Sequence, residues 1–97
     1  DWKIEEEFPQ IPKNKIIGIE APLWSETIST SNDIDYLTFP RLPAYSEIGW
    51  TNPIKRKWND FVIRIASHLF LWEERKINYY PSPLVDWKKN NLKPKNE

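Results

Sequence analysis

The sequence contains no cysteine and no methionine, and only two of its 97 residues are glycine. The absence of cysteine excludes disulfide bonds and thiolate metal sites, while leaving the cellular compartment open. Basic and acidic side chains number 14 each, so the net charge is zero and gives no electrostatic reason to expect binding to nucleic acid or an anionic membrane. No apolar run approaches the roughly 18 residues of a membrane span, and the N-terminus does not resemble a signal peptide. We therefore expect no nucleic-acid partner, no membrane partner and no metal or other cofactor.

Aromatic residues, by contrast, are abundant. The chain has six tryptophans, and aromatic residues make up 14% of it, which gives a large apolar surface to bury. Its length allows one domain at most, and nine prolines divide it into short segments. Three of the tryptophans, Trp50, Trp58 and Trp72, have the spacing of core residues.

The stretch KIIGIEA at residues 15–21 has the composition of a short buried strand. It is rich in β-branched residues, and it lies between an asparagine and a proline. A glycine in a strand often marks close packing, so Gly18 predicts that another part of the backbone or a ring approaches there. The preceding residues, 1–14, show no sustained period and are expected to be irregular.

Two short helices are predicted after this strand. Asn32 and Asp33 are capping residues in front of an apolar pattern typical of a helix over 33–38. Pro40 cannot lie within a helix without removing a hydrogen bond, but it suits the start of a second helix over 41–49.

The clearest helical pattern follows at residues 51–76. Its apolar residues recur every three or four positions on one stripe: Trp58, Phe61, Ile65, Leu69 and Trp72. Asn52 and Pro53 suit its start, so we expect one long helix. The last ten residues, 88–97, are predicted to be a polar, solvated tail.

A single strand followed by helices cannot complete a fold. An unpaired buried strand leaves its peptide groups without hydrogen bonds, and a strand followed by a crossover helix is one unit of a parallel sheet. The pattern therefore indicates the end of a larger α/β domain.

Three segments carry a resemblance to a known family. IIGIEAPLWSETI (16–28), YLTFPRLPAYSEIGW (36–50) and INYYPSPLVDW (77–87) are similar, in order and spacing, to the C-terminal end of a family 20 β-N-acetylhexosaminidase catalytic domain. The resemblance covers residues 1–87, including the DW at the start. It implies an α/β fold in which this chain is the C-terminal fragment of a TIM (β/α)8 barrel. The fragment would supply the eighth strand and the helices after it, being mostly α-helical with one short strand when isolated.

The resemblance also implies a binding role for two residues. Active sites of such barrels lie at the C-terminal ends of the strands, where Trp24 and Glu26 follow the predicted strand. In the family, the matching tryptophan forms part of the hydrophobic wall around the terminal N-acetylhexosamine, and the matching glutamate accepts hydrogen bonds from its 4- and 6-hydroxyls. The partners implied are an N-acetylhexosamine-containing glycan and the remainder of the barrel.

The implied mechanism is retaining and substrate-assisted, an exception to the scheme with two protein carboxylates. The family's catalytic Asp-Glu pair has no match in this chain, so no catalytic residue is assigned. The three glutamates at 5–7 precede the strand in a segment without a matching motif. The fragment alone is therefore expected to be inactive.

Several residues also have structural interpretations. A loop tryptophan such as Trp24 usually caps a core. Glu20 and Arg41 are predicted to form a structural ion pair, with each other or with Glu47, because a buried charge needs a partner. His68 is the only histidine and is not expected to bind metal. Tyr79 and Tyr80 are expected to be packing residues. The basic run Lys55, Arg56 and Lys57 is expected to be a solvated helix start.

Two other functions compete with that of a glycosidase fragment. A small sugar-binding module would use Trp24 to stack on a ring without hydrolysis, and it predicts sugar affinity by the isolated chain. A structural or interaction domain would use its aromatic residues only for its core, and it predicts neither affinity nor upstream catalytic carboxylates. The ordered motifs favour the first interpretation, an exo-acting hexosaminidase fragment.

Overall fold

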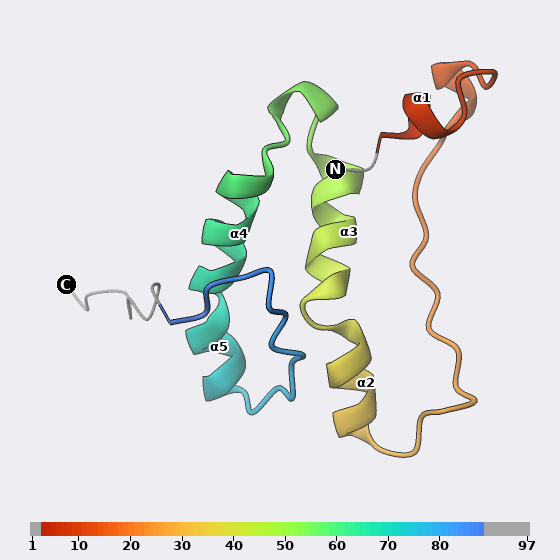
Figure 1. Cartoon of the computed structure of the whole chain (residues 1–97). Helices are drawn as coiled ribbons and strands as arrows, with labels where there is room; N and C mark the ends of the chain where they lie inside the picture. The colour runs from red at the N-terminus through yellow and green to blue at the C-terminus, as the bar shows by residue number, and fades with distance from the viewer. Residues whose placement is uncertain (1–2, 89–97) are drawn as a thin grey trace.

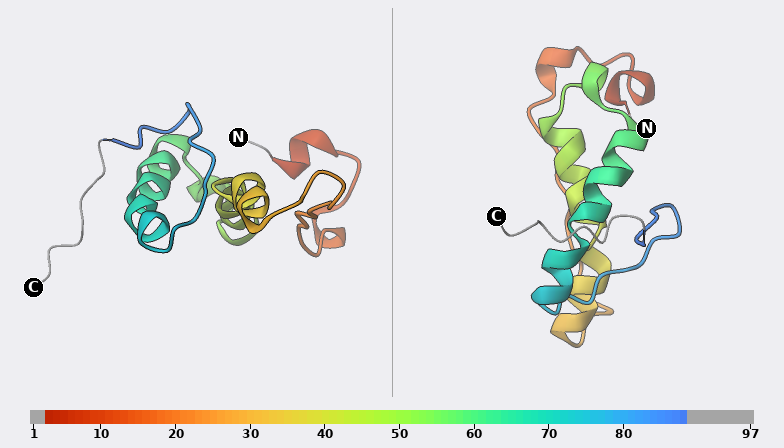
Figure 2. Two further views of the ribbon diagram at one scale, coloured as in Figure 1. Left: turned by 90° about the horizontal axis from the view of Figure 1, so that it is seen from below. Right: turned by 90° about the vertical axis from the view of Figure 1, so that its left-hand side faces the viewer.

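The computed structural model describes residues 3–88, which form short helices arranged in two columns beside an extended segment (Figures 1 and 2). In one column α2 and α3 stand end to end, in the other α4 and α5, and the extended segment runs along the far side of α2 and α3. The elements in chain order are α1 (Ile4–Glu7), η1 (Lys13–Lys15), α2 (Ser31–Thr38), α3 (Arg41–Trp50), η2 (Pro53–Lys55), α4 (Trp58–Ser67) and α5 (Leu69–Glu74). The first two residues of the family resemblance, Asp1 and Trp2, and all of the predicted tail except Lys88 lie outside the described residues.

The two predicted short helices are confirmed as α2 and α3. The N-cap of α2 is Thr30, in front of the predicted capping residues, and it forms a capping box with Asp33. Phe39 is extended because the residue before a proline avoids the helical region. Helix α3 then begins directly after Pro40.

The prediction of one long helix over 51–76 is wrong, because η2, α4 and α5 share this stretch. Asn52 caps only the single turn of η2. The break between α4 and α5 has a local cause at Ser67, whose hydroxyl donates a hydrogen bond of 2.5 Å to the carbonyl of Arg64. In a continuous helix that carbonyl would accept from His68, whose N–H instead bonds to Ile65. A serine hydroxyl that competes for the backbone in this way tends to bend or interrupt a helix.

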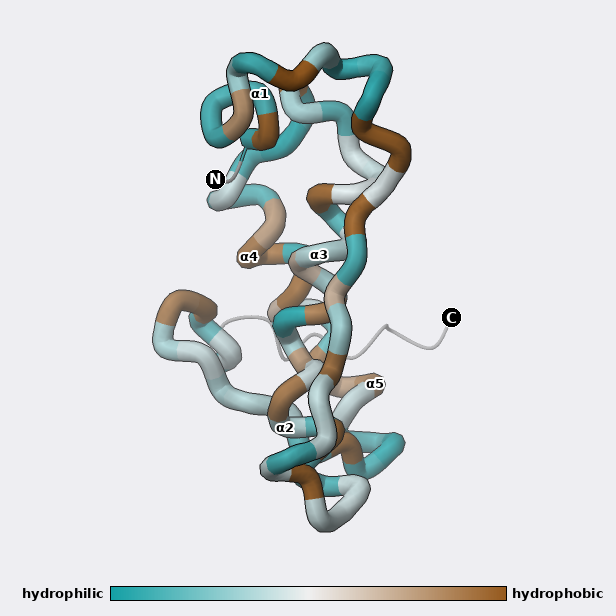
Figure 3. The backbone as a smooth tube through the Cα atoms, turned by 90° about the vertical axis from the view of Figure 1, so that its right-hand side faces the viewer, coloured by the Kyte–Doolittle hydropathy of each residue, from teal (hydrophilic) through white to brown (hydrophobic). Residues whose placement is uncertain are grey.

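The strand predicted over 15–21 does not form in the isolated chain, since no residue from 3 to 88 lies in a strand. Residues 16–25 are extended, but residues 3–88 contain no strand with which they could form a ladder. Figure 3 looks onto this segment, where hydrophobic and polar residues alternate, and Ile17 is fully exposed. Nothing lies within 4 Å of a Cβ placed on Gly18, so the close approach predicted there is absent from the described residues. It occurs instead at Gly49, where an added Cβ would lie 2.9 Å from Cγ2 of Ile19.

The core is small and centres on Trp72, which is 5% exposed. The centre of its ring lies 5.4 Å from the ring centre of Phe39, 5.7 Å from that of Tyr79 and 5.9 Å from that of Trp87. The C-terminal segment therefore packs over α5. The other buried apolar residues are Ile65, Ala66, Leu69 and Val85. The predicted stripe is thus buried at its C-terminal half, and the packing role predicted for Tyr79 is confirmed.

Two predicted core tryptophans are not in the core. Trp50 is 92% exposed at the end of α3, and Trp58 is 50% exposed at the start of α4. Both stand at the end of the helical columns away from the Trp72 cluster, where the described chain provides little to cover them. Most of the Trp50 side chain and half of the Trp58 side chain are therefore open to solvent.

Candidate functional site

The candidate site is the loop over residues 22–30, between the extended segment and α2. The loop turns tightly at Ser25, whose carbonyl accepts a hydrogen bond of 3.2 Å from the N–H of Ile28. Glu26 lies inside this turn and Trp24 just before it, and the Trp24 side chain is 72% exposed. Glu26 is also exposed, and it has no hydrogen bond or ion pair with any of residues 3–88. The loop thus presents an aromatic face and a free carboxylate to solvent.

Asp33 fixes the end of this loop. Its Oδ2 atom accepts hydrogen bonds of 2.9 Å from the N–H groups of both Ser29 and Thr30, and its own N–H donates to the Thr30 hydroxyl at 3.3 Å. These bonds stabilise the ionised carboxylate, with Ser29 contributing most, so the pKa of Asp33 lies below its ordinary value of 3.8. A capping aspartate was expected from the sequence, but its second bond, to the loop residue Ser29, was not.

Arg41 does not form the predicted ion pair. Its Nη1 atom donates to the carbonyl of Tyr36 at 3.0 Å and to that of Leu37 at 3.4 Å. Its guanidinium carbon lies 5.0 Å from the centre of the Tyr80 ring, and the Tyr80 N–H donates to the carbonyl of Phe39. Arg41 therefore caps the C-terminal end of α2, where a cation is favoured, and Tyr80 has the packing role that was predicted.

Glu47 pairs with Arg64 instead of Arg41. The Arg64 side chain donates to both Glu47 carboxylate oxygens, with Nη1–Oε2 at 3.1 Å, and its Nε donates to Asp60 at 2.8 Å. The bond from Arg64 lowers the pKa of Glu47, and the two carboxylates raise the pKa of Arg64. This network joins α3 to α4. The spacing of Asp60 and Arg64, four residues apart on a helix, was the available sequence signal. Glu20 makes no ion pair within residues 3–88 and instead borders a pocket.

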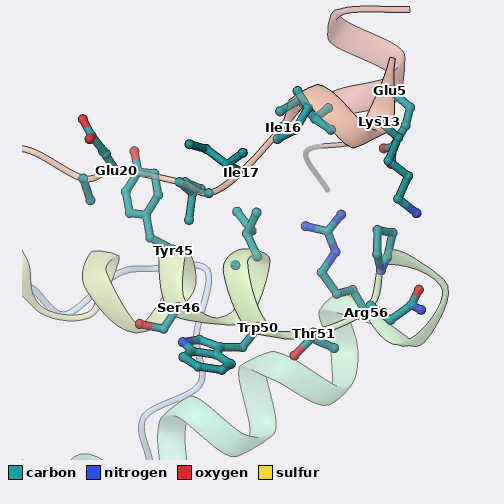
Figure 4. A pocket seen from close by; sticks show the side chains of 18 of the residues that line it. Glu5, Lys13, Ile16, Ile17, Glu20, Tyr45, Ser46, Trp50, Thr51 and Arg56 are labelled. Atoms are coloured by element: carbon teal, nitrogen blue, oxygen red, sulfur yellow. The ribbon is translucent and has the colours of Figure 1, made fainter. Parts of the chain in front are cut away.

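That pocket is a space of about 720 Å³ between the extended segment and α3. Figure 4 shows Ile17 and Glu20 on its extended wall, Tyr45 and Trp50 on the α3 side, and Arg56 reaching into it. Trp24 and Glu26 do not line it. The pocket therefore lies beside the extended segment and not at the end that carries the candidate site.

Arg56 departs from the expected solvated helix start. Its Nε and Nη1 atoms are buried and have no hydrogen-bond partner among the described residues. A buried N–H group without an acceptor is costly, and more so when it is charged. No sequence signal separated Arg56 from its neighbours Lys55 and Lys57, which are exposed.

The described residues hold no group of three or more histidine, cysteine, aspartate or glutamate side chains placed to bind a metal ion. Within residues 3–88, no helix has the length and apolar character needed to cross a membrane.

Comparisons with known proteins find a family and several relatives to which this chain is similar. Residues 2–53 match the model of glycosyl hydrolase family 20, catalytic domain. A β-N-acetylhexosaminidase of Cellulomonas fimi is 36% identical over 87 residues, which cover 90% of this chain and 18% of that protein. A β-hexosaminidase of Porphyromonas gingivalis is 32% identical over 77 residues, covering 79% of this chain and 10% of that protein.

Solved structures are similar to this chain in both fold and sequence. The family 20 β-N-acetylhexosaminidase of Streptomyces coelicolor A3(2) superposes with a TM-score of 0.84 at 39% identity, over 90% of this chain and 18% of that one. A mutant Streptomyces plicatus β-hexosaminidase in complex with the product GlcNAc gives the same TM-score and identity, over 90% and 17%. The matched proteins are glycoside hydrolases. The chain belongs to glycosyl hydrolase family 20, which its motifs resemble, and it spans less than a fifth of the length of each relative named here.

Proposed function

We propose that this chain supplies the eighth strand and the following helices of a TIM barrel in an exo-acting β-N-acetylhexosaminidase. The observation that carries the proposal is the combination of family membership with a fold that is open on one side. The extended segment over 16–21 has the composition of a strand but no neighbouring strand within residues 3–88, and Ile17 is fully exposed on it. Neighbouring barrel strands would satisfy its peptide groups and cover this side chain.

Other side chains at this end of the molecule support the same assembly. Trp50 and Ile54 are 92% and 88% exposed, and two buried N–H groups of Arg56 find no acceptor among residues 3–88. Apolar surface of this kind normally marks an interface. In the proposed barrel, residues 1–87 form the C-terminal part, and the remaining strands and helices cover these groups.

The loop over 22–30 would contact the terminal sugar. A pyranose ring has an apolar C–H face and a polar hydroxyl edge, so an exposed tryptophan matches the first and a carboxylate the second. Trp24 and Glu26 provide this pair, and neither is engaged in a hydrogen bond within the described chain. Trp24 would wall the sugar, and Glu26 would accept hydrogen bonds from its 4- and 6-hydroxyls.

Hydrolysis would proceed with retention and with the substrate's own acetamido oxygen as nucleophile. The Asp that steadies the resulting oxazolinium and the Glu that protonates the leaving oxygen would come from outside this chain. Within residues 3–88, Asp33, Glu47 and Asp60 are already held by structural hydrogen bonds. This chain's part is therefore recognition of the terminal residue, and residues 1–97 alone would be inactive.

A chimera tests the proposal. Residues 1–87 replace the matching segment of the Cellulomonas fimi β-N-acetylhexosaminidase, which supplies the rest of the enzyme. Release of the chromophore from an aryl N-acetylglucosaminide is the assay, with the same enzyme lacking the segment as control. We expect turnover by the chimera and none by the control or by residues 1–97 alone. An inactive chimera contradicts the proposed function, and sugar affinity without turnover supports a binding module instead.

A further inference from the structure

One carboxylate of α2 reaches back across the helix start into the candidate sugar-binding loop. Asp33 Oδ2 accepts the N–H of the N-cap Thr30 at 2.9 Å, as a capping box requires. The same oxygen also accepts the N–H of Ser29 at 2.9 Å. Ser29 belongs to the loop and not to the helix, so Asp33 does more than cap α2.

A further hydrogen bond holds the part of the loop that comes just before Ser29. Ile28 precedes Ser29, is half-buried, and closes the turn through its bond to the Ser25 carbonyl. The Ser29 N–H therefore donates to Asp33 and the Ile28 N–H donates to the Ser25 carbonyl, and Glu26 lies within the turn that this second bond closes. The backbone of Glu26 thus lies in a turn that is followed directly by the residue held by Asp33.

We propose that Asp33 is a positioning residue for substrate recognition, which acts by fixing the turn that carries Glu26 and Trp24. The inference rests on the proposed function, because it needs the loop to contact the sugar. Asp33 itself touches no substrate. The ionised carboxylate is the form that holds both N–H groups, and the lowered pKa of Asp33 agrees with this.

The same helix offers a matched control. Asp35 also accepts a backbone N–H, that of Asn78 at 3.3 Å. That bond ties α2 to the C-terminal segment and makes no contact with the loop. Replacing Asp35 by alanine removes one carboxylate–backbone bond from the same helix, where replacing Asp33 removes two, and it does not release the turn.

The test compares Asp33→Ala, Asp33→Asn and Asp35→Ala in the active chimera, by steady-state kinetics with an aryl N-acetylglucosaminide and by thermal melting. We expect Asp33→Ala to lower kcat/KM by about 3- to 30-fold, the range that a lost capping contact allows, mostly through KM. Asp33→Asn keeps an acceptor for both N–H groups and should recover KM to within about twofold. Asp35→Ala should lower the melting temperature with KM unchanged.

Three outcomes overturn the inference. The first is an unchanged KM for Asp33→Ala when Glu26→Gln raises KM, because the loop then binds sugar without needing this anchor. The second is an equal KM increase for Asp35→Ala, which would make the effect a general loss of stability. The third is an unchanged KM for Glu26→Gln, which refutes the proposed function together with the inference. If Asp33→Ala does not fold, Asp33→Ser, too short to reach both N–H groups, is judged by the same criteria.

Discussion

Replacing Glu26 by glutamine separates an effect on recognition of the sugar from an effect on folding. Glu26 is exposed and makes no hydrogen bond or ion pair with residues 3–88, so the change removes no internal contact. Exposed substitutions of this kind usually alter stability by less than about 0.5 kcal/mol. The shape of the side chain is retained, and only its charge and one acceptor oxygen are lost.

The expected loss lies in the bond to the sugar. A hydrogen bond to a charged group contributes about 1.5–3 kcal/mol, and each 1.36 kcal/mol corresponds to a tenfold change in rate. Glu26→Gln in the active chimera should therefore lower kcat/KM for an aryl N-acetylglucosaminide by roughly 10- to 150-fold. The melting temperature should stay within about 2 °C of the unmutated chimera.

The matched control is Glu74→Gln, which removes one charge from an exposed glutamate near the end of α5, outside the loop. It should leave kcat/KM unchanged. Equal kcat/KM for Glu26→Gln and the unmutated chimera would refute the assignment of Glu26. A large fall in melting temperature would show that Glu26 has a structural partner elsewhere in the barrel.

Two further predictions concern stability. Trp72→Ala should lower the free energy of unfolding by about 3–5 kcal/mol because the ring is 5% exposed, and Trp58→Ala, at 50% exposure, should lower it clearly less. Equal melting temperatures for the two variants would refute the assignment of Trp72 to the core. Because Arg64 lowers the pKa of Glu47, the stabilisation from this carboxylate is present above its ordinary pKa of 4.5 and is lost as pH falls through the lower pKa of the folded state. The melting temperature of Glu47→Gln should therefore fall less between pH 5 and lower pH than that of the unmutated chimera, and parallel curves would contradict this.

Helices with local signals could be predicted from the sequence. The capping pattern at the start of α2 and the proline between α2 and α3 act within a few positions, so both helices were placed correctly, although α2 begins at Ser31 and its N-cap is Thr30. The break after Ser67 depends on a side-chain bond to one carbonyl, which periodicity does not reveal. A single long helix was therefore the wrong interpretation of a correct apolar stripe.

Features that depend on distant parts of the chain could not be predicted in this way. The stretch over 15–21 has a strand's composition, but a strand needs a neighbour, and residues 3–88 provide none. Trp50 has a core residue's spacing, yet burial depends on what packs against it. The partner of Glu47 proved to be Arg64, 17 residues away, because helix packing and not sequence proximity brings charges together.

In the loop over 22–30, the residues could be singled out from the sequence, but the bond that fixes its end could not. Trp24 and Glu26 were singled out through a family resemblance, and family membership is now established, while their contact with sugar stays a prediction. The bond that the Ser29 N–H donates to Asp33 was not predicted, since a capping pattern predicts only the bond from the Thr30 N–H.

The most direct test is a crystal structure of the active chimera with bound N-acetylglucosamine. We expect strands paired on both sides of residues 16–21, with the Trp24 ring against the apolar face of the sugar. We also expect a Glu26 carboxylate oxygen about 2.5–3.0 Å from the 4- or 6-hydroxyl oxygen. A sugar bound with Trp24 and Glu26 both pointing into solvent would contradict the proposed role of this loop, even if the chimera is active.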